Sequence, residues 1–240
     1  MWVLIPKWVF IIFFIGLIGL TAWFVPFVNE LLISFGINPL PLRILFSIPG
    51  GVALLLYFSW RFFWRIPWLG ERLSRSVFPD LNGEYDVEIL SNWSIQKKIL
   101  DAAKTPKTSF DPSELSGKDS ELEKYEFRAA IKQSWFRFHI ELQPKQGASR
   151  ALKTSKTLVS RPIKASEFDR PKLAYLYEQE NDQYPSTDEK RFLGAALLDI
   201  DLENVHSFGG EFWTQRSWRQ GVNTAGKITF HLTKSKPILF

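Results

Sequence analysis

The chain of 240 residues has no cysteine, one methionine and three histidines. Without cysteine it has no disulfide bond, no thiolate nucleophile and no cysteine-based metal site. The histidines, His139, His206 and His231, lack the spacing of metal ligands, and neither a glycine-rich phosphate loop nor a nucleophile motif is present in the sequence. We therefore expect no catalytic residue, no metal and no cofactor, and an enzyme such as a membrane-bound nucleotide hydrolase is the weaker interpretation.

Charged residues are missing from two apolar runs near the N-terminus. Trp8–Val28 is a run of 21 residues without charge, and Ile44–Trp60 adds 17 more. A helix needs about 20 apolar residues to cross a bilayer, and the aromatic residues that follow the second run can complete its crossing in the headgroup layer. The sequence predicts two transmembrane helices joined by a short connector. The first run lacks the cleavage site of a signal peptide, so we expect it to be retained.

The basic residues beside these runs predict the orientation. Lys7 precedes the first run, Arg43 alone lies near the connector, and four arginines follow the second run: Arg61, Arg65, Arg72 and Arg75. Because Lys and Arg collect on the cytoplasmic side, both termini are expected in the cytoplasm. Six basic and two acidic residues precede Phe78, whereas the rest of the chain has 24 basic and 23 acidic residues. The pI of 9.3 therefore reflects membrane anchoring and gives no support for binding a DNA or RNA polymer.

Residues 1–77 are thus expected to form the membrane region, and residues 78–240 a cytosolic β-rich domain. Tyr85, Val87 and Ile89 alternate with acidic residues, the pattern of a half-buried strand, whereas Ser94–Lys104 has a helical apolar spacing. A loop is expected over Thr105–Ser120. The later predicted strands are Ala151–Val159, Lys172–Glu178, Phe192–Leu202, Gly210–Arg216 and Lys227–Leu232.

The apolar alternation changes phase within Tyr125–Leu142, where no Gly, Pro or Asn marks a turn. This pattern favours one long strand with a bulge near Ser134 that swaps the inward face. Seven or eight antiparallel strands suggest a small closed β-barrel that holds one small ligand, and a β-sandwich is the alternative.

Four motifs behind the two apolar runs carry a family resemblance. They are Phe-Pro-Asp-Leu-Asn-Gly-Glu-Tyr at 78–85, Ile-Lys-Gln-Ser-Trp at 131–135, Leu-Ala-Tyr-Leu-Tyr at 173–177 and Gly-Glu-Phe-Trp-Thr-Gln-Arg at 210–216. Because the four motifs occur in this order behind the two apolar runs, the chain resembles the two-transmembrane, β-strand-rich effector family of bacterial cyclic-oligonucleotide-based anti-phage signalling (CBASS). The resemblance implies a multi-pass protein of the bacterial inner membrane whose β-barrel binds a cyclic dinucleotide. It also implies a homo-oligomer that disrupts the membrane and arrests growth or kills the cell.

Several residues are candidates for ligand contacts. Gln133 and Arg216 are polar residues on otherwise apolar strand faces, and an Arg fork suits a phosphate, although Arg216 can equally be an exposed strand residue. Aromatic side chains can stack on bases or simply form the core. The candidate set is Gln133, Trp135, Arg150, Tyr175, Tyr177, Thr214 and Arg216, with Trp213 as a further aromatic.

Charge is also distributed unevenly along the predicted soluble domain. Lys145–Lys172 has eight basic and two acidic residues, whereas Glu178–Glu203 has eight acidic and two basic residues. The basic segment can attract an anion to the barrel mouth or face the anionic membrane surface. The two segments can pair between subunits or within one. A membrane-anchored barrel that binds lipid or another small ligand, or acts as a scaffold without toxicity, is the alternative function.

Overall fold

The computed structural model describes residues 5, 7–39, 42–63, 78–105, 109–111, 113, 115–135, 137–145, 152–163, 170–181, 190–202 and 204–235. Two long helices, α1 (Lys7–Ser34) and α2 (Leu42–Phe63), precede a β-rich part of the chain. Its elements are β1 (Gly83–Ser91), α4 (Trp93–Lys104), η3 (Asp119–Glu121), β2 (Glu123–Gln133), β3 (Phe138–Pro144), β4 (Leu152–Ile163), β5 (Lys172–Asn181), β6 (Arg191–Asp199), β7 (Ser207–Thr214), η4 (Trp218–Gln220) and β8 (Ala225–Ser235).

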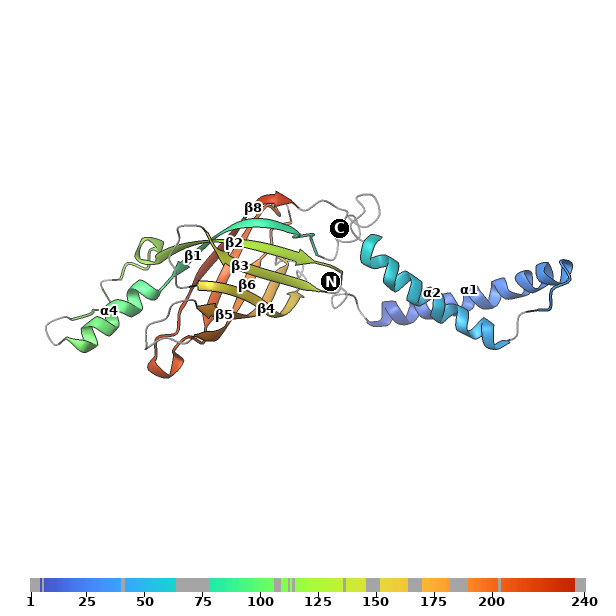
Figure 1. Ribbon diagram of the computed structural model, residues 1–240, viewed down its shortest axis with the longest axis horizontal. Helices are drawn as coiled ribbons and strands as arrows, with labels where there is room; N and C mark the ends of the chain where they lie inside the picture. The colour runs from blue at the N-terminus through green and yellow to red at the C-terminus, as the bar shows by residue number, and fades with distance from the viewer. Residues whose placement is uncertain are drawn as a thin grey trace.

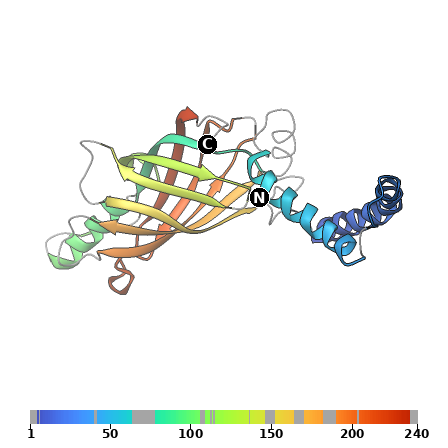
Figure 2. The same ribbon diagram turned by 45° about the vertical axis from the view of Figure 1, so that its right-hand side comes forward.

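The eight strands form a closed antiparallel barrel in chain order, in which β8 returns to pair with β1 (Figures 1 and 2). The predicted barrel is therefore confirmed, and the β-sandwich alternative is wrong. Closure pairs both sides of every strand, which removes the exposed edges that promote aggregation.

Alternation along each strand places apolar residues inside the barrel. In β5, Leu173, Tyr175 and Tyr177 are buried, whereas Leu176 between them is exposed. The same period of two buries Phe127, Ala129 and Ile131 in β2, and other strands add Phe208, Phe212 and Phe230. The helix at Ser94–Lys104 and the five later strands are confirmed within a few residues at their ends.

The long bulged strand predicted for Tyr125–Leu142 is wrong, because β2 and β3 are two strands of a hairpin. The ladder ends where Gln133 pairs with Phe138. Ser134 organises the connection: its amide donates to the Arg137 carbonyl at 2.7 Å, and its hydroxyl accepts from the Arg137 amide at 3.0 Å. The backbone amide and the hydroxyl of Ser134 thus supply the turn bonds without a Gly or Asn in the turn.

Helices α1 and α2 contain the two predicted spans and contact each other. By length and composition, α1 can cross a membrane: its mean hydropathy reaches 2.4, and that stretch is not buried in the protein. The apolar part of α2 in the described residues, Ser47–Ser59, is shorter. The second crossing and the cytoplasmic termini therefore remain predictions. The expected domain boundary at 77/78 adjoins residues 64–77, which lie outside the described ranges.

The barrel has two distinct ends. Figure 1 shows α1 and α2 extending from the end where β1 begins, and α4 projecting from the end where β1 finishes. We call these the helix-pair end and the α4 end. Any ligand site at the α4 end is therefore remote from α1 and α2.

Candidate ligand-binding pocket

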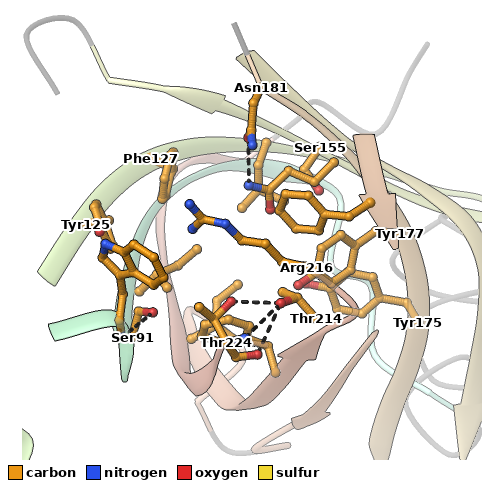
Figure 3. A pocket seen from close by; sticks show the side chains of 17 residues that line it. Ser91, Tyr125, Phe127, Ser155, Tyr175, Tyr177, Asn181, Thr214, Arg216 and Thr224 are labelled. Carbon is orange, nitrogen blue, oxygen red and sulfur yellow. Dashed lines mark hydrogen bonds between the residues drawn. The ribbon is translucent and has the colours of Figure 1, made fainter. Parts of the chain in front are cut away.

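A pocket of about 100 Å³ occupies the barrel interior near the α4 end (Figure 3). Its wall is largely aromatic, from Trp93, Tyr125, Phe127, Tyr175, Tyr177, Phe192 and Phe212. Buried polar side chains interrupt this apolar wall, namely Ser91, Ser155, Asn181, Thr214 and Thr224. A mostly apolar cavity with a few convergent polar groups is the usual form of a small-molecule site.

Arg216 supplies a cationic group in the pocket. Its guanidinium carbon lies 4.5 Å from the ring centroid of Trp93, the first residue of α4. A guanidinium over a tryptophan face is held by attraction to the ring quadrupole. Figure 3 shows the Arg216 side chain directed into the space enclosed by the aromatic residues. The pocket therefore presents a positive group and five buried neutral polar side chains within an apolar wall.

The connection between β7 and β8 positions Arg216. Thr214 donates its backbone amide to the Thr224 carbonyl at 2.8 Å, and the two hydroxyls lie 2.8 Å apart. Ser217 adopts a left-handed backbone with φ of 43°, an uncommon conformation for a residue with a Cβ. The buried threonine pair closes the loop, and the left-handed turn follows Arg216 immediately.

A similar set of bonds fixes the start of α4 against β8. The backbone amide of Asn92 donates to the Ala225 carbonyl at 3.0 Å, and the Asn92 side chain accepts from the Ala225 amide at 3.0 Å. The Ser91 hydroxyl accepts from the Trp93 amide at 3.3 Å. Trp93 thus lines the pocket from an anchored helix start, while the rest of α4 projects away from the barrel.

Burial raises the pKa of the pocket tyrosines. Desolvation raises the pKa of Tyr175 well above its usual range and also raises that of Tyr177. For Tyr125, desolvation is again the largest cause of a raised pKa, reinforced by Glu123 and opposed by the charge of Arg216. All three side chains therefore offer phenol groups, which both donate and accept hydrogen bonds.

Four of the seven predicted contact residues line this pocket: Tyr175, Tyr177, Thr214 and Arg216. They come from β5, from the end of β7 and from the loop that follows it. The structure thus brings together residues about 40 positions apart in sequence. Whether they contact a ligand remains a prediction.

Gln133 and Trp135 are not part of the pocket, because they lie near the end of β2 at the helix-pair end. The Gln133 side chain accepts from the Leu81 amide at 2.7 Å and donates to the Pro79 carbonyl at 2.9 Å. Its buried amide therefore satisfies backbone groups of the segment that leads into β1. Trp135 is also buried and belongs to the core cluster. Both positions have a structural explanation that the face pattern alone did not reveal.

Arg150 lies outside the described residues. Within the described part of the basic segment, Arg170 pairs with Asp201 at 3.5 Å and Lys172 with Asp199 at 3.3 Å. These contacts join the basic and acidic segments within one chain. Trp213 is half exposed and is absent from the pocket wall, so it lies on the outer face of the barrel.

Three pocket residues were not predicted from the sequence: Ser91, Asn181 and Trp93. Ser91 continues the inward series of Tyr85, Val87 and Ile89, and Asn181 continues that of Tyr175 and Tyr177. Extending each alternation to the strand end would have found both. No pattern in the sequence indicates that Trp93 lines the pocket.

The described residues hold no group of three or more acidic, histidine or cysteine side chains with the geometry to bind a metal ion.

The fold and pocket define a class of protein: a small-ligand receptor built on a closed eight-stranded barrel and attached to an apolar helix pair. The family described as "Cap15, cyclic dinucleotide receptor domain" matches residues 113–232, which is half of the chain. The chain belongs to this family.

A curated relative supports the same assignment. The CD-NTase-associated protein 15 of Escherichia albertii is 25% identical over 177 residues, which cover 74% of each chain. The resemblance to CBASS effectors drawn from the four motifs is therefore confirmed. The family match spans β2 to most of β8 and so includes the pocket residues on β4 to β7.

Proposed function

We propose that the chain is a membrane-anchored receptor that binds a cyclic dinucleotide in the pocket at the α4 end and then assembles to disrupt the inner membrane. The observation that carries this proposal is the position of Arg216 among the aromatic side chains of the family-matched barrel. A cyclic dinucleotide combines phosphate anions with two flat bases. An Arg fork pairs with phosphate oxygens, and aromatic rings stack on bases.

Ligand binding requires the pocket to open. Small-molecule sites usually enclose about 300 to 1,000 Å³, whereas this pocket has about 100 Å³. Trp93 and the guanidinium of Arg216 both line the cavity, where they stack on each other. We infer that the ligand displaces Trp93 and takes its place over Arg216, exchanging a cation–π contact for an ion pair with phosphate.

The polar residues then supply base contacts. Ser155 and Asn181 are buried on β4 and β5 beside Tyr177, and their hydroxyl and amide groups suit the hydrogen-bonding edge of a base. Ser91 and Thr224 lie on the opposite side of the pocket in Figure 3. A ligand with two bases fits a cavity that has polar groups on two sides. A fatty acid fits such a cavity less well, because it needs a continuous apolar channel.

The test is ligand-dependent stabilisation of the full-length protein in detergent. We would measure the melting temperature with cyclic di-AMP, cyclic di-GMP, cyclic GMP-AMP, cyclic di-UMP, a cyclic trinucleotide and oleate. Binding to the folded state alone raises stability by RT ln(1 + [L]/Kd), about 2.7 kcal/mol at 100 times Kd. At least one cyclic dinucleotide is expected to raise the melting temperature. Stabilisation by oleate with no response to any cyclic nucleotide would establish the lipid-binding alternative.

The membrane step is tested separately. Co-expression with a cyclic dinucleotide synthase is expected to depolarise the inner membrane and arrest growth. Helix α1 carries no charge between Trp8 and Val28, so a single copy offers no polar pathway through a bilayer. Damage should therefore depend on assembly of many copies. A chain whose α1 apolar run is replaced by a polar segment should bind ligand and cause no depolarisation.

A further inference from the structure

An apolar row crosses the outer face of the barrel on four consecutive strands. Val159 on β4 pairs with Leu176 on β5, Leu176 pairs with Ala195 on β6, and Ala195 pairs with Trp213 on β7. Val159 is 62% exposed and Trp213 is 50% exposed. Exposed apolar side chains scattered singly are ordinary, but a contiguous row marks an interaction site.

The two ends of this row lie on different sides of the barrel, because β5 and β6 separate them. At one end, the bulge between Thr157 and Val159 turns Leu158 outward as well, and Leu158 is 54% exposed. At the other end, Leu193 lies diagonally beside Trp213 on the outer face. We define the β4 patch as Leu158, Val159 and Leu176, and the β7 patch as Leu193 and Trp213.

The adjacent row of paired residues runs parallel to the first and carries opposite charges at its two ends. Arg161 on β4 pairs with Ala174, Ala174 pairs with Leu197, and Leu197 pairs with Glu211 on β7. Arg161 and Glu211 are each displaced two residues from the apolar row toward the helix-pair end. Lys227, the cross-strand neighbour of Glu211 on β8, makes its ion pair with Asp119 at 2.8 Å.

We propose that the β4 patch of one copy docks on the β7 patch of the next, with Arg161 opposite Glu211 of the neighbouring copy. The occupant is a second copy of this chain, because Arg161 and Glu211 have opposite charges and are displaced by the same two residues, toward the same end of the barrel, from Val159 and Trp213. A contact between two different patches is heterologous and repeats, giving rings or open filaments. The proposal deepens the assembly step and rests on the proposed function.

The geometry also agrees with membrane anchoring. Docking with both charges on the helix-pair side of their patches keeps the axes of neighbouring barrels in the same direction. All helix pairs then emerge at the same end of the array and can enter one membrane. The α4 ends, with their pockets, stay accessible on the opposite side.

The chain has no cysteine, so engineered thiols report this contact directly. The full-length protein is reconstituted in vesicles of phosphatidylethanolamine and phosphatidylglycerol and oxidised with copper phenanthroline. A disulfide requires Cα atoms within about 7 Å. The double variant Val159→Cys/Trp213→Cys is expected to give a ladder of covalent multimers, whereas each single variant stays monomeric. Mixing the two single variants should give dimers only.

A matched pair on the other side of the barrel is the control. Arg128→Cys/His231→Cys places two thiols on the outer positions of β2 and β8, and it should give no ladder. Dimers from either single variant would indicate a two-fold contact and overturn the head-to-tail arrangement. Absence of a ladder from the double variant, with or without cyclic dinucleotide, would also overturn the proposal.

Charge exchange provides the second readout. In the double-cysteine background, Arg161→Glu or Glu211→Arg alone is expected to lower the multimer yield about fivefold, and the combined exchange should restore it. A combined variant as poor as the single ones would refute the pairing. The cyclic dinucleotide panel is run on the same samples by thermal shift. Stabilisation without a ladder rejects this interface alone, whereas a ladder without stabilisation rejects the ligand and leaves the interface standing.

Discussion

Gly194 on β6 leaves the space that the ring of Tyr177 on β5 occupies. The two residues pair directly and both face the barrel interior. A Cβ at position 194 would overlap the Cζ, hydroxyl and Cε2 atoms of the tyrosine. A glycine at this point thus allows a large aromatic side chain to lie flat across the neighbouring strand and form part of the pocket wall.

Gly194→Ala is therefore expected to displace the Tyr177 ring and disturb the pocket. Overpacking of this kind costs about 1 to 3 kcal/mol of stability, and the cyclic dinucleotide should bind more weakly. The second substitution Tyr177→Leu, which shortens the side chain, should recover the stability but not the affinity. Thermal melting and isothermal titration measure the two effects. Full affinity in Gly194→Ala would mean that the ring is not a ligand contact.

Sequence alternation predicted the barrel interior well because the inward face must be apolar along every strand. It placed Tyr175, Tyr177, Thr214 and Arg216 on faces that the structure directs into one pocket. It failed where hydrogen bonding decides the outcome. Ser134 closes the β2–β3 turn through its backbone amide and its hydroxyl, whereas the prediction considered only Gly, Pro or Asn as turn residues.

Contacts over long sequence distances were also beyond the sequence patterns. Trp93 meets Arg216 only because the barrel closes β8 against β1 and brings the β7–β8 loop beside the start of α4. In the same way, Gln133 bonds the segment before β1 across more than 50 residues. A face pattern identifies a buried polar residue but does not distinguish a ligand contact from a structural bond.

Removing the cation from the pocket tests the phosphate contact. Arg216→Ala is expected to weaken cyclic dinucleotide binding by about 1.5 to 3 kcal/mol, the usual contribution of a hydrogen bond to a charged group. Arg216→Lys should recover little, because an ammonium group lacks the planar fork. Arg219→Ala, an exposed arginine three residues away, is the control and should bind normally. Wild-type affinity in Arg216→Ala would show that Arg216 does not contact the ligand.

Gln133 should contribute to stability and not to binding. Gln133→Ala leaves the Leu81 amide and the Pro79 carbonyl without their buried partner, at a cost of about 1 to 3 kcal/mol for each unsatisfied group. Urea denaturation should therefore show a clear loss, whereas Gln143→Ala on the exposed face of β3 should change little. Where the variant remains folded, its affinity for ligand should be unchanged. A selective loss of affinity would instead return Gln133 to the ligand site.

The buried tyrosines predict alkaline sensitivity. Their pKa values in the folded chain lie above the unfolded value of about 10, so the folded state keeps its protons when the unfolded state loses them. Stability is unaffected below about pH 10 and falls above it, by at most about 1.4 kcal/mol per pH unit for each tyrosine. In Tyr175→Phe/Tyr177→Phe the decline between pH 9 and 11 should be shallower. Lysines titrate in both proteins, so the difference between the two melting curves isolates the tyrosines.

The Trp93 ring should control how fast ligand enters the pocket. Its contact with Arg216 stabilises the closed form by about 0.5 to 2 kcal/mol, a range that corresponds to a roughly 2- to 30-fold change in the fraction of open pockets. Trp93→Ala is therefore expected to raise the association rate of the cyclic dinucleotide by that factor in stopped-flow experiments.

The chain contains a matched control for this effect. Arg219 lies over the ring of Trp218 at 5.6 Å, the same kind of pair, but neither residue lines the pocket. Trp218→Ala should leave the association rate unchanged. If Trp93→Ala lowers affinity through faster dissociation while association stays constant, the ring stacks on the bound ligand and does not close the pocket. A faster association in Trp93→Ala alone would identify the start of α4 as the gate of the receptor.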